Sequence, residues 1–100
     1  MALHDLPSLC KCLRDLLPSL NESFGVGQLW IVGSRARGEH RPNSDLDLLV
    51  EFERRGISLL GFCRMEHQLS DALGVTVDLI ERGAMHPVVE ASLEQDAVAV

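Results

Sequence analysis

Two aspartates of this chain, Asp45 and Asp47, are spaced so that they could bind a metal ion together. They lie in the run Ser-Asp-Leu-Asp-Leu-Leu-Val at 44–50. Side chains two positions apart on a β-strand project from the same face, while the intervening Leu46 faces the opposite side. Two carboxylates held this close repel each other unless a cation lies between them. Magnesium prefers oxygen ligands and commonly takes one or two protein carboxylates together with substrate phosphates. The spacing therefore predicts a magnesium site at Asp45 and Asp47.

A third carboxylate, Asp78, follows Val-Thr-Val in the alternating segment 75–80. On a neighbouring strand it could complete a pair of metal sites about 4 Å apart. Two metals at that spacing stabilise the attacking and the leaving oxygens of an in-line phosphoryl displacement. We therefore expect two Mg²⁺ ions, with Asp45, Asp47 and Asp78 as their ligands and as the catalytic residues.

A Gly-Ser pair, Gly33 and Ser34, ends the apolar run 28–32 and suits phosphate binding. Glycine lets the backbone approach a phosphate closely, and the N–H groups of the following turn and the Ser34 hydroxyl are natural donors. Three arginines that follow, Arg35, Arg37 and Arg41, could neutralise a departing pyrophosphate. His40 in the same loop could meet a phosphate, and its competing interpretation is a surface loop histidine. We expect Gly33, Ser34, Arg35 and Arg37 to bind the triphosphate. The competing interpretation is that serines and aspartates near strand ends form turns and that arginines are solvated surface residues.

The elements that must position these residues alternate between helix and strand. Asp5 and Pro7 mark the start of a helix with a leucine stripe, which Pro18 should end or kink near Leu17. The remaining pattern predicts a loop at 21–27, strands at 28–32, 45–52, 75–80 and 97–100, and helices at 58–73 and 87–95. The fold class is therefore α/β. We expect one domain over 1–100, with a small mixed sheet, helices packed mainly on one face, and the acids exposed on the other.

Composition and charge narrow the function further. The chain is 46% hydrophobic and 24% charged, as in an ordinary soluble globular protein. Its net charge of −6 argues against direct binding of nucleic acid, which depends on many Lys and Arg contacts to phosphates. One basic loop in an acidic protein favours a small anionic ligand. Three cysteines, no signal-like start and no membrane-length apolar segment predict a cytoplasmic protein that does not bind membranes.

The two motifs together resemble those of a known family. Gly-Ser-Arg-Ala-Arg-Gly at 33–38 and Ser-Asp-Leu-Asp-Leu-Leu-Val at 44–50 are similar to the motifs of minimal nucleotidyltransferases of the DNA polymerase beta superfamily. The resemblance covers nearly the whole chain and implies the nucleotidyltransferase fold. One departure is Val32, which stands directly before Gly-Ser where members often carry an aromatic residue; Trp30 lies two positions earlier on the same face.

The resemblance also implies roles for the motif residues. Gly33 and Ser34 would bind the triphosphate, and Asp45 and Asp47 would hold both metals. Asp78 would hold the metal that activates the acceptor hydroxyl.

A partner and a substrate follow from the resemblance as well. Many such proteins resemble antitoxins encoded beside a helical HEPN-domain toxin, an RNase, and some are similar to enzymes that adenylylate that toxin on tyrosine. The implied activity is magnesium-dependent transfer of a nucleoside monophosphate, AMP from ATP, onto a hydroxyl of a HEPN-type partner. Two alternatives are an antitoxin that neutralises its partner by contact without catalysis, and a subunit whose nucleotide pocket only senses ligand. The complete set of three acids favours the enzyme, because contact alone would not require them.

Overall fold

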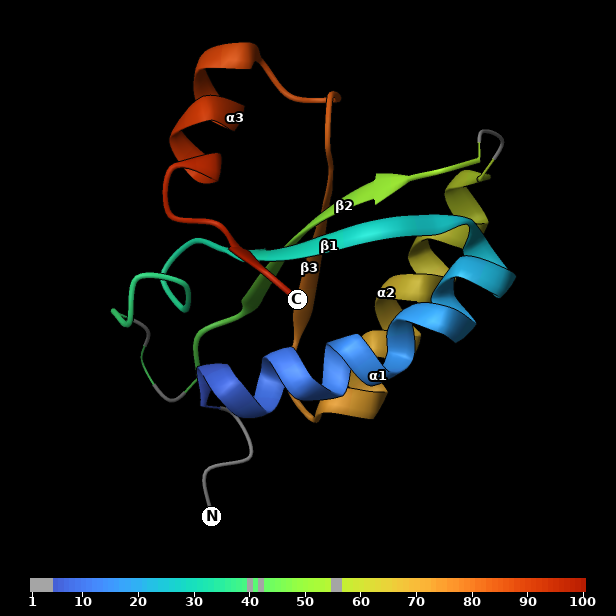
Figure 1. The fold of residues 1–100 in the computed structure, drawn as a ribbon, viewed down its shortest axis with the longest axis horizontal. Coiled ribbons are helices and arrows are strands. Elements are labelled where there is room, and N and C mark those ends of the chain that lie inside the picture. Colours follow the sequence, from blue (N-terminus) through green and yellow to red (C-terminus); the bar gives the residue numbers. More distant parts are fainter. Residues whose placement is uncertain (1–4, 40, 42, 55–56) are drawn as a thin grey trace.

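A mixed sheet organises the chain in the computed structural model, which describes residues 5–39, 41, 43–54 and 57–100. The strands are β1 (Val26–Val32), β2 (Leu46–Phe52), β3 (Val77–Glu81) and β4 (Val98–Ala99), in the order β3-β2-β1-β4. β1 is antiparallel to β2 and to β4, whereas β2 and β3 are parallel. The N-terminal ends of β2 and β3 and the C-terminal end of β1 therefore lie together, at the same end of the strands (Figure 1).

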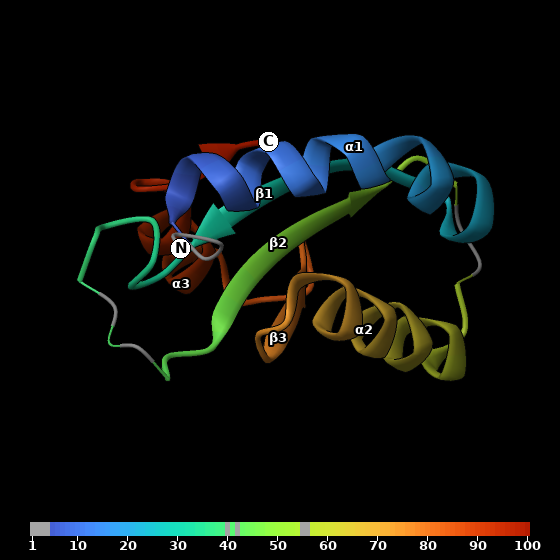
Figure 2. The ribbon, with the colours of Figure 1, turned by 90° about the horizontal axis from the view of Figure 1, so that it is seen from below.

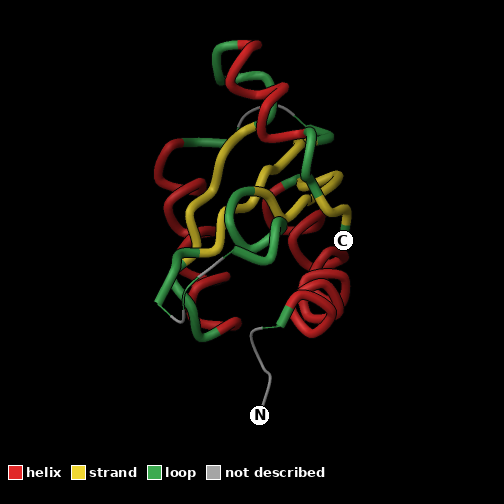
Figure 3. Tube along the Cα trace, turned by 90° about the vertical axis from the view of Figure 1, so that its left-hand side faces the viewer, coloured by secondary structure: helices red, strands yellow, loops and turns green. Residues whose placement is uncertain are grey.

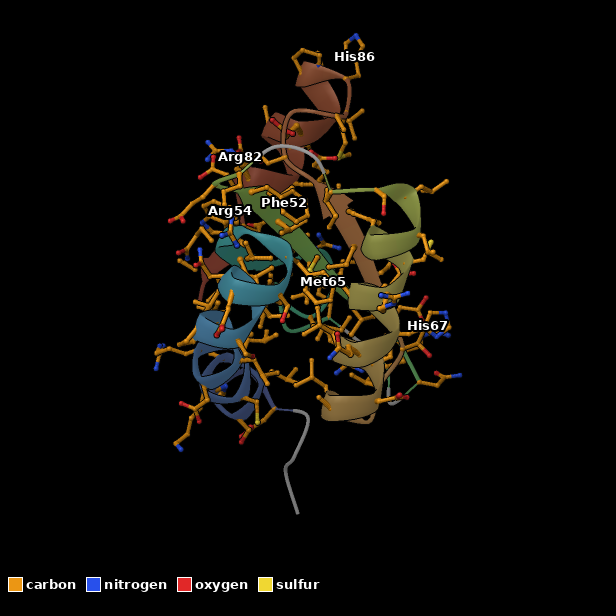
Figure 4. All side chains as sticks on the ribbon, turned by 90° about the vertical axis from the view of Figure 1, so that its right-hand side faces the viewer. Phe52, Arg54, Met65, His67, Arg82 and His86 are labelled. Atoms are coloured by element: carbon orange, nitrogen blue, oxygen red, sulfur yellow. The ribbon has the colours of Figure 1, made fainter. Side chains whose placement is uncertain are left out.

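Two long helices cover one face of this sheet. α1 (Leu6–Phe24) and α2 (Leu59–Leu73) lie on the same side of the strands, and α3 (Pro87–Glu94) lies beyond the opposite side (Figures 1 and 2). Alternate β2 residues face α1 and α2; these are Leu46, Leu48 and Val50, all fully buried in the main core cluster. Met65 of α2 lies in the same core, between the two helices (Figure 4). The expected α/β class, with helices mainly on one face, is confirmed.

The prediction that the first helix ends near Leu17 is wrong, because α1 continues past Pro18. α1 begins as expected, with the Asp5 carboxylate accepting a 3.0 Å hydrogen bond from the Ser8 N–H, but it continues through Pro18 to Phe24. Proline removes one backbone donor from a helix and leaves a carbonyl one turn earlier without its partner. Pro18 is exposed, so water can satisfy that carbonyl, while Leu20 two residues later is buried in the core. Core packing thus outweighs the local preference.

The loop expected at 21–27 is correspondingly shorter. Its first four residues are helical, and the chain reverses at Gly25, whose φ of 78° is a left-handed conformation typical of a helix C-cap. β1 then begins at Val26, two residues earlier than the sequence pattern suggested. The other expected elements are confirmed to within two residues at most of their ends.

Residues 5–39, 41, 43–54 and 57–100 include no helix that combines the length and the apolar character needed to cross a bilayer.

Candidate active site

Asp47 occupies the centre of the candidate site because its strand is central in the sheet. In the parallel pair it lies directly opposite Asp78 of β3, and in the antiparallel pair it lies opposite Val32 of β1. Asp78 is exposed, and Asp47 is half-buried. Asp45 is also exposed and precedes β2 by one residue. The strand register therefore places Asp47 and Asp78 side by side on neighbouring strands. Asp45 lies two residues before Asp47, just outside β2.

Burial and like charge both act on the Asp47 carboxyl. Burial raises its pKa, and the neighbouring carboxylates of Asp78 and Asp45 raise it further. The guanidinium groups of Arg35 and Arg37 act in the opposite direction. A carboxylate held partly out of water beside two other acids is a group that a bound cation would stabilise.

Gly33 packs directly against Asp47. Its φ is 75°, and a Cβ atom built on it would lie 2.5 Å from Oδ2 of Asp47. A Cβ atom at that distance would displace the carboxylate, and the positive φ would strain any residue other than glycine, so both the conformation and the space favour glycine at position 33. The Gly of the predicted phosphate motif thus also shapes the site of the acids.

The turn that follows Gly33 is tied together by backbone hydrogen bonds. The Arg37 N–H donates to the Gly33 carbonyl at 3.3 Å, and the Glu39 N–H donates to the Ser34 carbonyl at 2.9 Å. Ser34 is half-buried at the start of this turn. Figure 3 views the molecule from the side on which this turn lies, in front of the strand ends. The turn therefore places Gly33 and Ser34 beside the acids, as their predicted role at the triphosphate requires.

Arg35 lies inside the turn rather than on its surface. Its side chain is only 3% exposed, and its Nη2 donates a 2.6 Å hydrogen bond to the Ser44 carbonyl. Ser44 immediately precedes Asp45, and its hydroxyl accepts a 2.8 Å hydrogen bond from the Arg41 N–H. Arg35 thus connects the phosphate-binding turn to the start of the acidic strand. Its predicted contact with the triphosphate stays a prediction, and the structure adds this positioning role.

Arg37 is the more accessible arginine of the turn. Its Nε lies 2.5 Å from Oε1 of Glu39, and this hydrogen bond is the largest cause of its raised pKa. The acidic groups of Asp96 and Asp47 also raise the pKa of Arg37, so its guanidinium lies in the field of the candidate site. Its predicted contact with the triphosphate stays a prediction. His40, the other basic residue considered for phosphate contact, lies outside the described residues.

The acids of the candidate site offer the hard oxygen ligands that magnesium prefers. In the part of the chain that the structure describes, no three acidic, histidine or cysteine side chains are gathered as ligands of a single ion. Magnesium does not need such a group, because one or two carboxylates with water and phosphate oxygens complete its octahedron. Asp47 with Asp45 or with Asp78 offers that number of hard oxygen ligands.

Comparison with known proteins identifies the family. The model of the nucleotidyltransferase domain matches residues 13–100 of the chain. The chain belongs to this family of nucleotidyltransferases. Protein adenylyltransferase MntA of Thermococcus cleftensis is 34% identical to this nucleotidyltransferase over 100 residues, which is 100% of both chains. The protein named "Putative protein adenylyltransferase MJ1217" of Methanocaldococcus jannaschii is 38% identical over 96 residues, 95% of this chain and 97% of that protein.

Solved structures agree with this membership. A structure described as a "putative minimal nucleotidyltransferase" superposes on this nucleotidyltransferase with a TM-score of 0.80, at 34% identity over 100% of both chains. A toxin–antitoxin structure with AMP-PNP matches with a TM-score of 0.71, covering 86% of this chain and 69% of that one; at 18% identity the likeness shows the fold alone. The protein is thus an enzyme of the nucleotidyltransferase class with the fold that its motifs implied.

Two residues beyond Asp47 as seen from Gly33, Trp30 and Arg82, were not predicted as site residues. Arg82 lies over the Trp30 ring, 5.2 Å from its centroid. The signal was present in the alternation of Val-Asp-Leu-Ile-Glu-Arg at 77–82, which places Arg82 on the same face as Asp78.

Proposed function

We propose that this nucleotidyltransferase transfers AMP from ATP to a hydroxyl of a HEPN-type protein partner, with two Mg²⁺ ions bound at Asp45, Asp47 and Asp78. The observation that carries the proposal is the strand register, in which Asp47 lies opposite Asp78 and against Gly33. Carboxylates for metal ions and a glycine turn for phosphates are thus adjacent. Bound magnesium would supply charge neutralisation for the phosphates and a lowered pKa for the attacking hydroxyl.

The chain's own residues then have separate tasks. Gly33 and Ser34 bind the β- and γ-phosphates at the turn, and Arg37 stabilises the negative charge of the departing pyrophosphate. Asp45 and Asp47 would hold both metal ions beside the α-phosphate, and Asp78 would hold the metal ion beside the acceptor hydroxyl. The bond between the acceptor oxygen and the α-phosphorus forms, the bond from that phosphorus to pyrophosphate breaks, and the hydroxyl proton is released to solvent.

The names of related proteins support AMP as the group and a toxin as the acceptor. MntA of Thermococcus cleftensis is named a protein adenylyltransferase. One structural neighbour contains a tri-AMPylated HEPN toxin of Shewanella oneidensis in complex with an MNT antitoxin. The net charge of −6 also favours a protein acceptor over a nucleic acid. A tyrosine hydroxyl of the partner is the proposed acceptor.

The direct experiment mixes the purified chain, its HEPN-type partner, ATP and Mg²⁺, and follows the partner by mass spectrometry. Each transferred AMP adds about 329 Da, because pyrophosphate is lost. The Asp47→Asn variant should give no mass change. Asp71→Asn, which alters an exposed aspartate of α2, is the matched control and should transfer like the unchanged chain.

Two results would contradict the proposal. Neutralisation of the partner without a mass change, equally by the Asp47→Asn variant, would establish an antitoxin that works by contact. ATP binding measured by calorimetry that is the same in EDTA as in Mg²⁺ would refute the role of the acids as metal ligands.

A further inference from the structure

A row of apolar side chains crosses the sheet next to the acids. Leu49 follows Asp47 by two residues on β2 and therefore projects from the same face. Trp30 of β1 lies directly opposite Leu49 and also opposite Ala99 of β4. The Trp30–Leu49 row lies about 7 Å along the sheet from the row of Asp47, a distance comparable with the length of a tyrosine side chain.

This row forms the floor of a hollow between the sheet and α3. The hollow has a volume of about 270 Å³ and is lined by Trp30, Leu49, Arg82, Glu94, Ala97 and Ala99. It is slightly smaller than the roughly 300–1,000 Å³ of sites that enclose a drug-sized ligand. Its floor is apolar and aromatic and its rim is charged, so it suits one amphipathic aromatic side chain better than a whole nucleoside.

Arg82 holds the walls of the hollow in place. Its Nη1 lies 2.9 Å from Oε2 of Glu51 on β2, and its Nε lies 3.0 Å from Oε1 of Glu94 on α3. The same guanidinium covers the Trp30 ring, 5.2 Å from its centroid. Arg82, labelled in Figure 4, thus joins β1, β2 and α3 around the hollow. It is a positioning residue.

The order of these features along the sheet defines a direction. Gly33 follows Val32, which lies opposite Asp47, whereas Trp30 precedes Val32 and lies opposite Leu49. Asp47 and Asp78 therefore lie between the Gly33 turn on one side and the hollow on the other, whereas Asp45 lies on the side of the turn. In an in-line displacement the attacking and the leaving oxygens lie on opposite sides of the phosphorus. With pyrophosphate at the Gly33 turn, the attacking oxygen must arrive from the side of the hollow.

We propose that the hollow at Trp30 and Leu49 binds the phenol ring of the acceptor tyrosine and directs its hydroxyl toward Asp78. This inference rests on the proposed function for the direction of transfer. The binding of a phenol ring is independent of it, because the residues that line the hollow are other residues than those of the Gly33 turn and the three acids. The competing occupant of the hollow is the base of the nucleotide.

The only tryptophan of the chain, Trp30, makes this binding measurable. N-acetyl-tyrosinamide should change the fluorescence of Trp30 in a saturable manner, excited at the red edge of indole absorption where tyrosine does not absorb. N-acetyl-serinamide, an aliphatic alcohol, should not. Ala99→Leu fills the hollow and should weaken binding of the tyrosine probe by at least about tenfold, because it excludes an aromatic ring from burial. Ala72→Leu, at an exposed position of α2, is the matched control and should bind like the unchanged chain.

A second variant, Ala97→Leu, fills the hollow from the segment between α3 and β4 and should act like Ala99→Leu; thermal unfolding verifies that both are folded. Both variants should keep the calorimetric affinity for ATP with Mg²⁺ and lose transfer to the partner. If Ala99→Leu and Ala97→Leu lost affinity for ATP as strongly as for the tyrosine probe, the inference would be overturned and the hollow would be assigned to the base. An unchanged Trp30 signal with the tyrosine probe would also overturn it. Absence of Mg²⁺-dependent ATP binding in the unchanged chain would instead contradict the proposed function alone.

Discussion

The contact between Gly33 and Asp47 leads to a quantitative prediction for Gly33→Ala. An alanine there must adopt a φ of 75°, and its Cβ must lie 2.5 Å from Oδ2 and 3.3 Å from Cγ of Asp47. Gly38 offers a matched control, because its φ is 72° and a Cβ there meets no atom within 4 Å. The left-handed backbone should cost both variants about 1–2 kcal/mol. The Asp47 side chain must also leave its rotamer in Gly33→Ala, which adds about 1 kcal/mol.

Urea unfolding of both variants measures the difference. We expect Gly33→Ala to lower the free energy of unfolding by about 1 kcal/mol more than Gly38→Ala does. The excess should vanish when Asp47 is also replaced by alanine, because the closest remaining atom, Cβ of residue 47, lies 3.5 Å away at an ordinary contact distance. This double-mutant cycle isolates the contact from backbone strain.

Gly33→Ala should also lose transfer activity, because a displaced Asp47 carboxylate no longer orients the α-phosphate. Equal destabilisation by Gly33→Ala and Gly38→Ala would refute the reasoning. An excess that persists without the Asp47 carboxylate would refute it as well, since the clash would then lie elsewhere.

Three further predictions concern the charged residues. Asp47→Asn should raise the free energy of unfolding by about 0.5–1 kcal/mol near neutral pH, because burial and like charge raise the pKa of Asp47 and its ionised form therefore destabilises the fold. That gain should disappear in urea titrations at a pH below the pKa of an unfolded aspartate, because Asp47 is then protonated in both the folded and the unfolded protein. A gain that does not change with pH would contradict the role of the Asp47 charge. Arg35→Ala should lower the free energy of unfolding by about 2 kcal/mol, because it deletes a buried side chain and its hydrogen bond. Arg41→Ala, at an exposed position, should lower it by less than about 0.5 kcal/mol. Equal losses would show that burial of Arg35 contributes nothing. Asp78→Asn should keep most of the calorimetric ATP affinity and lose transfer to the partner, with Asp71→Asn as control; transfer at the unchanged rate would make Asp78 an ordinary strand residue.

Local patterns determined most of the elements and the identity of the candidate residues. The two-residue spacing of Asp45 and Asp47 requires only that the segment be a strand. The alternation of Asp-Leu-Asp-Leu at 45–48 and the apolar residues that follow it predict one. The Gly-Ser pair after an apolar run likewise reports a strand followed by a turn. Such features depend on neighbours in the chain, so the sequence alone sufficed to predict them.

Local preference misled where long-range packing acted against it. Pro18 is a strong stop signal, yet α1 continues because Leu20 is buried in the core against other elements. Burial of an apolar side chain contributes about 1.5–3 kcal/mol, comparable with the roughly 3 kcal/mol that a helix-interior proline costs.

Only the tertiary structure decided how the acids, the turn and the hollow fit together. Asp78 is opposite Asp47 rather than one residue away because β3 joins β2 in one particular parallel register. The burial of Arg35 and the contact of Arg82 with Trp30 likewise join segments separated along the chain by loops or whole helices. A spacing rule carries no information about such pairs, because strand register and the docking of α3 result from packing of the whole core.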